Sequence, residues 1–110
     1  MAGFEPGDWV LGRYRGGAFY FPGVVQHVGT DGAVTIAYDD GDRETVPAGS
    51  AKPYAWRIGS RIEAIWSGNG QWYDANIVAA HDNGADLVVR FDDGIEETTV
   101  TARCRERVAT

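Results

Sequence analysis

The sequence predicts an all-β protein built of two small, related barrels. Three observations carry this prediction: the chain repeats itself at a spacing of about 50 residues, its apolar stretches are joined by short glycine-containing turns, and no stretch has the periodicity of a long helix. Fifteen glycines against four prolines in 110 residues fit the many tight turns of such a protein. Because a unit of ~50 residues buries little apolar surface, a curled sheet that closes into a barrel is the economical solution.

The repeat is visible in glycines, acidic turns and aromatic residues. Three glycines recur 52 positions later: Gly7 as Gly59, Gly16 as Gly68 and Gly32 as Gly84. The triplet DDG at 39–41 recurs 53 positions later, at 92–94, so one residue has been inserted near Asp86. The aromatic residues also correspond, as the pairs Tyr14 and Trp66, Tyr20 and Trp72, Phe21 and Tyr73, and Tyr38 and Phe91.

Each unit is predicted to contain strands separated by turns. In the first unit the strands are expected at 9–14, 19–28, 33–38 and 43–46, and in the second at 61–66, 71–79, 87–91 and 96–100. Turns rich in Gly, Asn and Asp are expected at 81–86 and at both DDG triplets. The segment PAGSAKP (47–53) is interpreted as the connector. The two units are therefore placed at 5–50 and 57–107, and the basic stretch ARCRER (102–107) is interpreted as a solvated end.

Charge and composition argue against several classes of binding partner and several cellular locations. The formal net charge is −6, which repels phosphate backbones and disfavours nucleic acid as a partner. No apolar run approaches the ~20 residues that span a bilayer, so no membrane partner is expected. The first residues, MAGFEPGDW, lack the basic and then apolar pattern of a signal peptide. We therefore expect an intracellular protein, in the cytoplasm rather than the nucleus.

The sequence predicts neither catalysis nor a cofactor. One cysteine, Cys104, and two scattered histidines, His27 and His81, do not suggest a metal site. The serines have no histidine close to them in the sequence, and neither a G-x-S-x-G pattern nor a P-loop is present. The expectation is a protein that is not an enzyme and that binds no metal or cofactor.

The ordered motifs of each unit resemble those of the Tudor domain. The order is A-x-W, a short glycine-containing turn, W-Y-x-A-x-I, a strand and F-D-D-G, and it occupies 63–77 and 88–97 in the second unit. The first unit is similar through 11–25 and 36–44. Tudor domains belong to a wider group with Agenet, chromo and MBT modules. The resemblance implies a tandem pair of five-stranded, SH3-like barrels.

It also implies an aromatic cage at one end of each barrel. Carried over by position, the second cage consists of Trp66, Tyr73, Phe91 and Asp93, and the first of Tyr14, Phe21, Tyr38 and Asp40. The position after the DDG glycine, often aromatic in Tudor cages, holds Ile95 in the second unit and Asp42 in the first. In the second cage we expect Trp66 and Tyr73 side by side and partly exposed, with Phe91 as floor or third wall and Asp93 at the rim.

The chemistry of such a cage suits a methylated cation. An aromatic face attracts a cation within ~6 Å of its centre, worth ~0.5–2 kcal/mol per ring. Methyl groups lower hydration and pack on rings, and a carboxylate such as Asp93 accepts a hydrogen bond from any remaining N–H. The predicted function is a non-enzymatic module that binds a protein or peptide methylated on lysine or arginine, in mono- or dimethylated rather than trimethylated states.

A second interpretation remains open. Phe91 shares its strand parity with Leu87 and Val89, and Tyr38 with Val34 and Ile36, so these rings could fill the core instead of a cage. The DDG triplets are also good hairpin turns without any ligand. The chain would then be a structural protein–protein interaction module without a functional methyl-reading cage. The aliphatic Ile95 and the absence of tryptophan from the first cage favour this alternative.

Overall fold

The computed structural model describes residues 3–81 and 85–108. Within these residues the chain forms ten β-strands and three short 3-10 turns, and no α-helix occurs. The prediction of an all-β protein is thereby confirmed. The chain divides into two compact units, Met1–Tyr54 with Val108–Thr110 and Ala55–Arg107. In the same described residues, no helix has the length and apolarity needed to cross a membrane.

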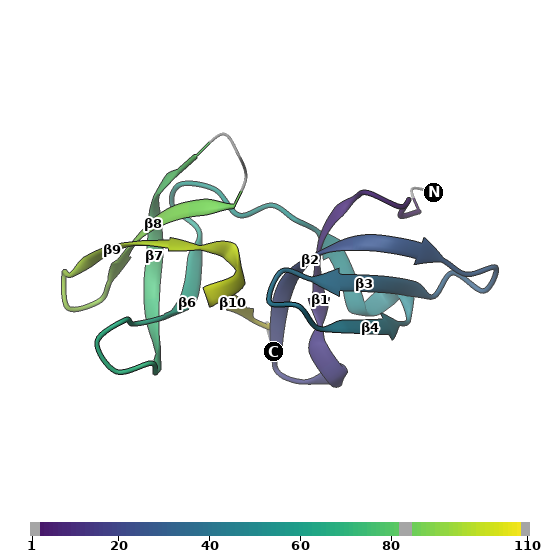
Figure 1. Cartoon of the computed structure of the whole chain (residues 1–110), viewed down its shortest axis with the longest axis horizontal. Helices are drawn as coiled ribbons and strands as arrows, with labels where there is room; N and C mark the ends of the chain where they lie inside the picture. Colours follow the sequence, from purple (N-terminus) through teal and green to yellow (C-terminus); the bar gives the residue numbers. More distant parts are fainter. Residues whose placement is uncertain (1–2, 82–84, 109–110) are drawn as a thin grey trace. The chain divides into compact units, whose positions relative to one another are not determined.

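The first unit is a curled antiparallel sheet. Its strands are β1 (Trp9–Arg13), β2 (Phe19–Val28), β3 (Val34–Tyr38), β4 (Arg43–Val46) and β5 (Ala51–Pro53). Strands β1 to β4 pair in sequence order, and β5 returns to pair with the other side of β1 (Figure 1). Two 3-10 turns interrupt the strands, η1 (Tyr14–Gly16) after β1 and η2 (Ala48–Ser50) before β5.

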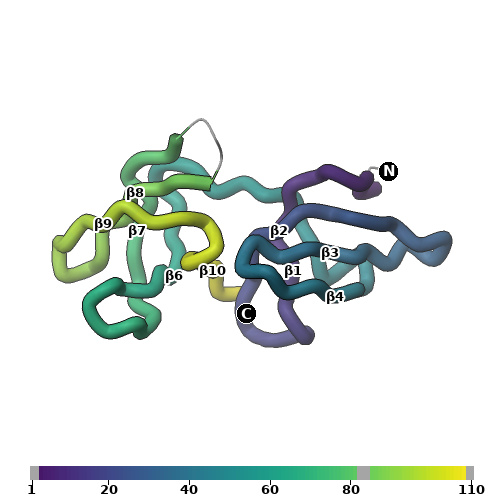
Figure 2. Tube along the Cα trace, viewed as in Figure 1, coloured from purple at the N-terminus to yellow at the C-terminus, as the bar shows by residue number. Residues whose placement is uncertain are grey.

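The second unit has the same order of strands. They are β6 (Arg61–Ile65), β7 (Trp72–Ala80), β8 (Asp86–Phe91), β9 (Glu96–Val100) and β10 (Cys104–Arg107), with the turn η3 (Thr101–Arg103) before β10. Strands β6 to β9 pair consecutively, and β10 pairs with β6, as β5 does with β1. The register shifts between Val25 and His27 in β2 and between Ile77 and Ala79 in β7. Such irregularities bend and twist a strand, which fits the strongly curved trace of both sheets (Figure 2).

Two segments differ from the sequence-based expectation. The predicted connector 47–53 contains η2 and β5, because its backbone completes the hydrogen bonding of β1. The stretch 102–107, expected to be a solvated end, is ordered instead: β10 pairs with β6 and Cys104 is fully buried. That expectation was wrong because charge alone was considered, whereas the strand's arginines find a carboxylate partner on β6. The turn expected at 81–86 lies partly outside the described residues.

Alternation along the strands builds the core and determines where the site lies. In β3 the buried residues are Val34, Ile36 and Tyr38, and in β8 they are Leu87, Val89 and Phe91. In the first unit these pack with Val10, Val25 and Val46. Since Tyr38 and Phe91 are the last inward residues of their strands, each core ends in an aromatic ring. The acidic DDG turn follows directly, so the apolar core and the charged turn meet at the same end of the sheet.

Replacing Ile77 by alanine tests this assignment of the core. Ile77 is 1% exposed, so Ile77→Ala should lower the free energy of unfolding by ~2–5 kcal/mol, the usual cost of a large-to-small change in a packed core. Ile58→Ala, in the same unit, is the matched control, because Ile58 is 67% exposed and its truncation should cost less than ~0.5 kcal/mol. Urea unfolding measures both, and equal losses would contradict the assignment.

Candidate functional site

A pocket lies at the aromatic end of the second unit. Its volume is about 420 Å³, and its lining residues are Trp66, Tyr73, Asp74, Phe91, Asp92 and Asp93. Trp66 follows β6 directly, Tyr73 is near the start of β7, and Phe91 ends β8. Asp93 belongs to the turn between β8 and β9. The structure thus brings the four residues expected from the sequence, Trp66, Tyr73, Phe91 and Asp93, around one hollow.

The Tyr73 ring stands at nearly right angles to the rings of Trp66 and Phe91. The centroids of Trp66 and Tyr73 are 6.2 Å apart with an interplanar angle of 81°, and those of Tyr73 and Phe91 are 6.5 Å apart at 90°. In this arrangement the positive edge of one ring meets the negative face of another. Tyr73 is 43% exposed and Phe91 only 5%, so the first is a wall and the second a floor. Phe91 therefore belongs both to the core and to the pocket.

The loop before β7 positions Trp66 through two glycines. The N–H of Gly70 donates to the Trp66 carbonyl at 2.8 Å, and the N–H of Trp66 donates to the Gln71 carbonyl at 2.9 Å. Gly70 adopts a φ of +73°, which glycine accepts without strain. At Gly68 a Cβ atom would lie 2.5 Å from the nearest atom of the Trp66 indole. The indole therefore rests on a position where a side chain has no room.

Asn69 orients the hydroxyl of Tyr73. The Gln71 N–H donates to Asn69 Oδ1 at 2.9 Å, which fixes the direction of the side-chain amide. The Asn69 Nδ2 then faces Tyr73 and donates to its hydroxyl oxygen at 2.7 Å. Sequence reasoning treated Asn69 only as a turn former. The asparagine of the SGNG turn was the available signal, but its second partner depends on the fold.

Glu97 ties the same loop to the neighbouring strand. Its Oε1 accepts hydrogen bonds from the Ser67 N–H at 3.2 Å and from the Ser67 hydroxyl at 2.9 Å. Ser67 is the residue directly after Trp66, so this contact restrains the pocket wall from the side of β9. In the sequence, Glu97 stands out only because it corresponds to Glu44, 53 positions earlier, in the repeat. Nothing in its local pattern indicated a link across 30 positions.

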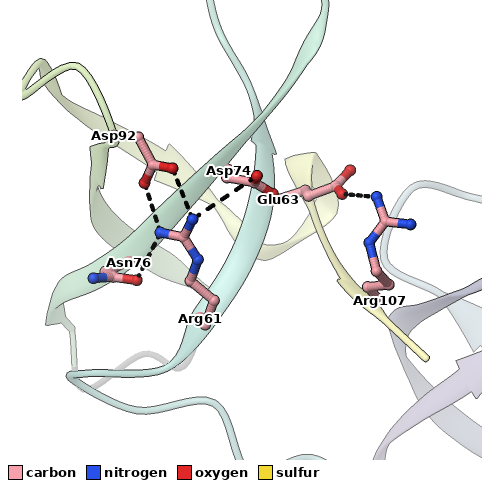
Figure 3. Close-up of polar contacts among 6 residues, drawn as sticks. All are labelled: Arg61, Glu63, Asp74, Asn76, Asp92 and Arg107. Atoms are coloured by element: carbon pink, nitrogen blue, oxygen red, sulfur yellow. Dashed lines mark hydrogen bonds and ion pairs between the residues drawn. The ribbon is translucent and has the colours of Figure 1, made fainter. Parts of the chain in front are cut away.

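Two kinds of hydrogen bond hold the acidic turn at 92–94, one from the backbone and one from an arginine. Asp93 Oδ1 accepts the Ile95 N–H at 3.0 Å and closes the turn, while Ile95 itself is 45% exposed. Asp92 receives two hydrogen bonds from the Arg61 guanidinium, at 2.6 and 2.7 Å (Figure 3). The guanidinium lowers the pKa of the Asp92 carboxyl, chiefly through these hydrogen bonds. Asp92 is therefore an anion already paired with an internal cation, whereas Asp93 uses one oxygen for the turn.

Arg61 also approaches Asn76 at 3.2 Å and Asp74 at 3.8 Å. Because side chains alternate along β7, Asp74 and Asn76 point to the face opposite Tyr73 and Ala75. Figure 3 shows Arg61, Asp74, Asn76 and Asp92 converging on one side of the ribbon. The Arg61 network thus holds two of the residues that line the pocket, Asp74 and Asp92.

Glu63 explains why the last strand is ordered. It is 7% exposed and belongs to β6, the strand between β7 and β10. Its Oε1 accepts hydrogen bonds from Arg105 at 2.8 and 3.0 Å. Its Oε2 accepts one from Arg107 at 2.9 Å, as Figure 3 shows. The Arg105 guanidinium also lies 4.2 Å from the centre of the Trp72 ring. Trp72 is therefore part of this support and does not line the pocket.

The first unit gathers its aromatic residues in the same way. The Tyr14 ring lies 5.9 Å from Phe21 and 5.6 Å from Tyr38, with interplanar angles of 76° and 88°. Tyr38 is 4% exposed and its hydroxyl donates to Glu44 at 2.9 Å. Burial first, and then Glu44, raise the pKa of Tyr38. Asp40 is exposed, and its Oδ1 accepts the Asp42 N–H at 3.1 Å, as Asp93 does with Ile95.

No metal centre is evident in the described residues, since no group of three or more His, Cys, Asp and Glu side chains is suitably placed among them. Cys104 is buried in β10, where it pairs with Ala64 of β6, and burial raises the pKa of its thiol to about 12. The thiol is therefore protonated at neutral pH and is a poor nucleophile. The chemistry of the site consists of aromatic faces and carboxylates.

Comparison with known proteins identifies no relative: no family model matches the chain, and no curated protein matches its sequence.

Adding a methyl group at Gly68 should displace the pocket wall. In Gly68→Ala the new Cβ would overlap the Trp66 indole, so the ring must rotate and its fluorescence and indole N–H resonance should change. Gly49→Ala is the matched control, because a Cβ there meets nothing within 4 Å and its φ is not positive. An unchanged Trp66 signal in Gly68→Ala would contradict the packing described.

Removing Arg61 should raise the pKa of Asp92. In Arg61→Gln the carboxyl loses the hydrogen bonds and the charge of its cationic partner, so its pKa should rise toward the ordinary range of aspartate. In the native protein the pKa is lowered on folding; the stabilisation is therefore present at neutral pH and is lost as the pH falls through the lowered pKa. Carboxyl NMR titration measures this shift. Arg90→Gln, which removes the partner of Glu96, is the control and should leave Asp92 unmoved.

Proposed function

We propose that this protein is a non-enzymatic, tandem Tudor-like module that binds a methylated lysine or arginine side chain of a partner protein or peptide. The observation that carries the proposal is the pocket of the second unit, where Trp66, Tyr73 and Phe91 line a hollow of about 420 Å³ together with Asp93, and Tyr73 is nearly perpendicular to both other rings. A methylated ammonium or guanidinium group would enter the hollow that Trp66, Tyr73 and Phe91 line together.

The lining suits a weakly hydrated cation. Each aromatic face contributes ~0.5–2 kcal/mol to binding a cation within ~6 Å of its centre. Methyl groups pack on the rings, and a remaining N–H of the ligand would donate to a carboxylate oxygen of Asp93. The six lining residues include no serine, cysteine, histidine or lysine, which supports binding rather than catalysis. The net charge of −6 favours a cationic partner over a nucleic acid.

The arrangement of strands supports the Tudor-like interpretation. In each unit four strands pair in sequence order, the fifth strand pairs with the first, and the second strand is irregular at a corresponding position. This order is what a five-stranded SH3-like barrel would have. The aromatic residues that the resemblance assigns to a cage lie at the same end of both sheets, beside the acidic turn.

Substitution of Trp66 tests the proposed site. Titrations of short peptides carrying unmodified, mono-, di- or trimethylated lysine, or methylated arginine, should show binding only of methylated forms by calorimetry. Trp66→Ala should weaken that binding at least about tenfold, which corresponds to ~1.4 kcal/mol. Trp9→Ala is the matched control, because Trp9 is 52% exposed and does not line the pocket. Equal affinities of both variants, with both folded, would refute the proposed site.

Asp93→Asn tests the role of the carboxylate. Asparagine keeps an Oδ1 that can accept the Ile95 N–H, so the turn should be preserved while the charge is lost. Affinity for mono- and dimethylated peptides should fall, whereas that for a trimethylated peptide, which has no N–H to donate, should fall less. The ratio of the two dissociation constants measures this effect. Equal losses for all methylation states would mean that Asp93 contributes charge alone.

A further inference from the structure

Arg15 lies over one ring of the aromatic cluster of the first unit, that of Tyr14. It follows Tyr14 directly, as Ser67 follows Trp66 in the second unit. The central carbon of its guanidinium is 5.3 Å from the centre of the Tyr14 ring, within the range of a cation–π interaction. Its Nε also donates a hydrogen bond to the Tyr14 hydroxyl at 3.1 Å. The chain therefore supplies a cation of its own to the first cluster.

The backbone of Arg15 is held in a conformation that places it there. Its φ is +53°, and it is the one non-glycine residue with a positive φ in the described part of the chain. Such a conformation is unfavourable for a residue with a Cβ and persists where its surroundings impose it. Here the Arg15 N–H donates to both oxygens of Glu44, at 2.8 and 3.1 Å. Glu44 also accepts the Tyr38 hydroxyl, so one carboxylate joins Arg15 to the floor of the cluster.

The second unit has the same support with a different side chain. Glu97 accepts the N–H of Ser67 as Glu44 accepts that of Arg15. Serine at this position is short, and its hydroxyl is bound to Glu97 instead of extending over Trp66. The contrast between an arginine and a serine at matching positions therefore separates a covered cluster from an open pocket.

We propose that Arg15 is an intramolecular ligand of the first aromatic cluster, and that its guanidinium excludes external methylated ammonium or guanidinium cations from Tyr14. Of the two aromatic clusters, only that of the second unit is then open to an external cation. The statement about the second unit rests on the function proposed above, whereas the interaction of Arg15 with Tyr14 does not.

An exchange of the two residues tests the proposal. Tetramethylammonium chloride is titrated into the whole chain, with NMR signals of Tyr14, Tyr38, Trp66 and Tyr73 as reporters. Arg15→Ser should create a second set of responding signals at Tyr14 and Tyr38, and Ser67→Arg should weaken the response at Trp66 and Tyr73. Arg15→Gly, which accepts a positive φ freely, repeats the first test if the serine variant is poorly folded. Arg43→Ser, an exposed arginine of the same unit, is the control and should behave like the native chain.

A second readout does not depend on any ligand. The side-chain protons of Arg15 should be shifted upfield by the Tyr14 ring in the native protein, and Tyr14→Leu should abolish that shift. Absence of the shift in the native protein would overturn the proposal, as would a response of Tyr14 in the native chain equal to that in Arg15→Ser. Arg15→Ser and Arg15→Gly that are folded but silent at Tyr14, while Trp66 responds, would also overturn it. If Trp66 is silent in every chain, the open second site fails, while the upfield shift still decides whether Arg15 occupies Tyr14.

Discussion

A glutamate on the fourth strand of each unit holds the loop that follows the first strand. Glu97 binds Ser67, and Glu44 binds Arg15 and the hydroxyl of Tyr38. This loop carries the aromatic residue Tyr14 or Trp66, which directly follows the last residue of the first strand of its unit. Without the carboxylate, the N–H of Ser67 or Arg15 would lose this protein partner, and the ring directly before it would lose one of its restraints. The glutamate thus converts the edge of a small sheet into a defined aromatic wall.

The smallness of each unit explains why its rings serve two purposes. A sheet of about 50 residues has few inward positions, and Tyr38 and Phe91 occupy the last of them. One face of Phe91 closes the core and the other forms the floor of the pocket. Stability and binding consequently draw on the same side chain. The more exposed rings, Trp66 and Tyr73, are less constrained by the core and depend on Gly68, Asn69 and Glu97 for their positions.

Arginine pairing shapes the charge of this acidic chain. Arg61 is paired with Asp92, and Arg105 and Arg107 with the buried Glu63. These pairs hold the outer face of the second sheet and its last strand, and they partly neutralise the carboxylates nearest to them. Of the three aspartates that line the pocket, Asp74 and Asp92 lie near Arg61, whereas Asp93 accepts the Ile95 N–H. Among these three aspartates, the carboxylate left to attract a cation is therefore that of Asp93. In the first unit Arg15 supplies a positive charge directly at the ring of Tyr14.

Local patterns in the sequence determined the all-β class and most strand boundaries, and the resemblance of the ordered motifs to a Tudor domain pointed to the residues that lie at the pocket. Alternation and turn residues act over two to five positions, so they can be recognised without a fold; 19–28, 43–46 and 96–100 are strands as expected. The repeat added the correspondence of Tyr14, Phe21 and Tyr38 with Trp66, Tyr73 and Phe91. These residues were assigned to a cage by the resemblance to the Tudor motif, whereas strand parity alone left Tyr38 and Phe91 open as core residues.

Only the tertiary structure decided which partners hold those residues in place. The links between Ser67 and Glu97, Arg61 and Asp92, and Glu63 and Arg105 join positions 30 to 42 residues apart, and no local period relates them. The basic stretch 102–107 was misjudged for the same reason: its charges looked solvated until β6 supplied a buried carboxylate. Likewise, the sequence did not distinguish Arg15 from a surface arginine. Its positive φ and its place over the Tyr14 ring depend on the hydrogen bond to Glu44, which is 29 residues away. Long-range hydrogen bonds and ion pairs form only when distant strands are brought together in the fold, and the residues next to a position in the sequence do not reveal which strands these are.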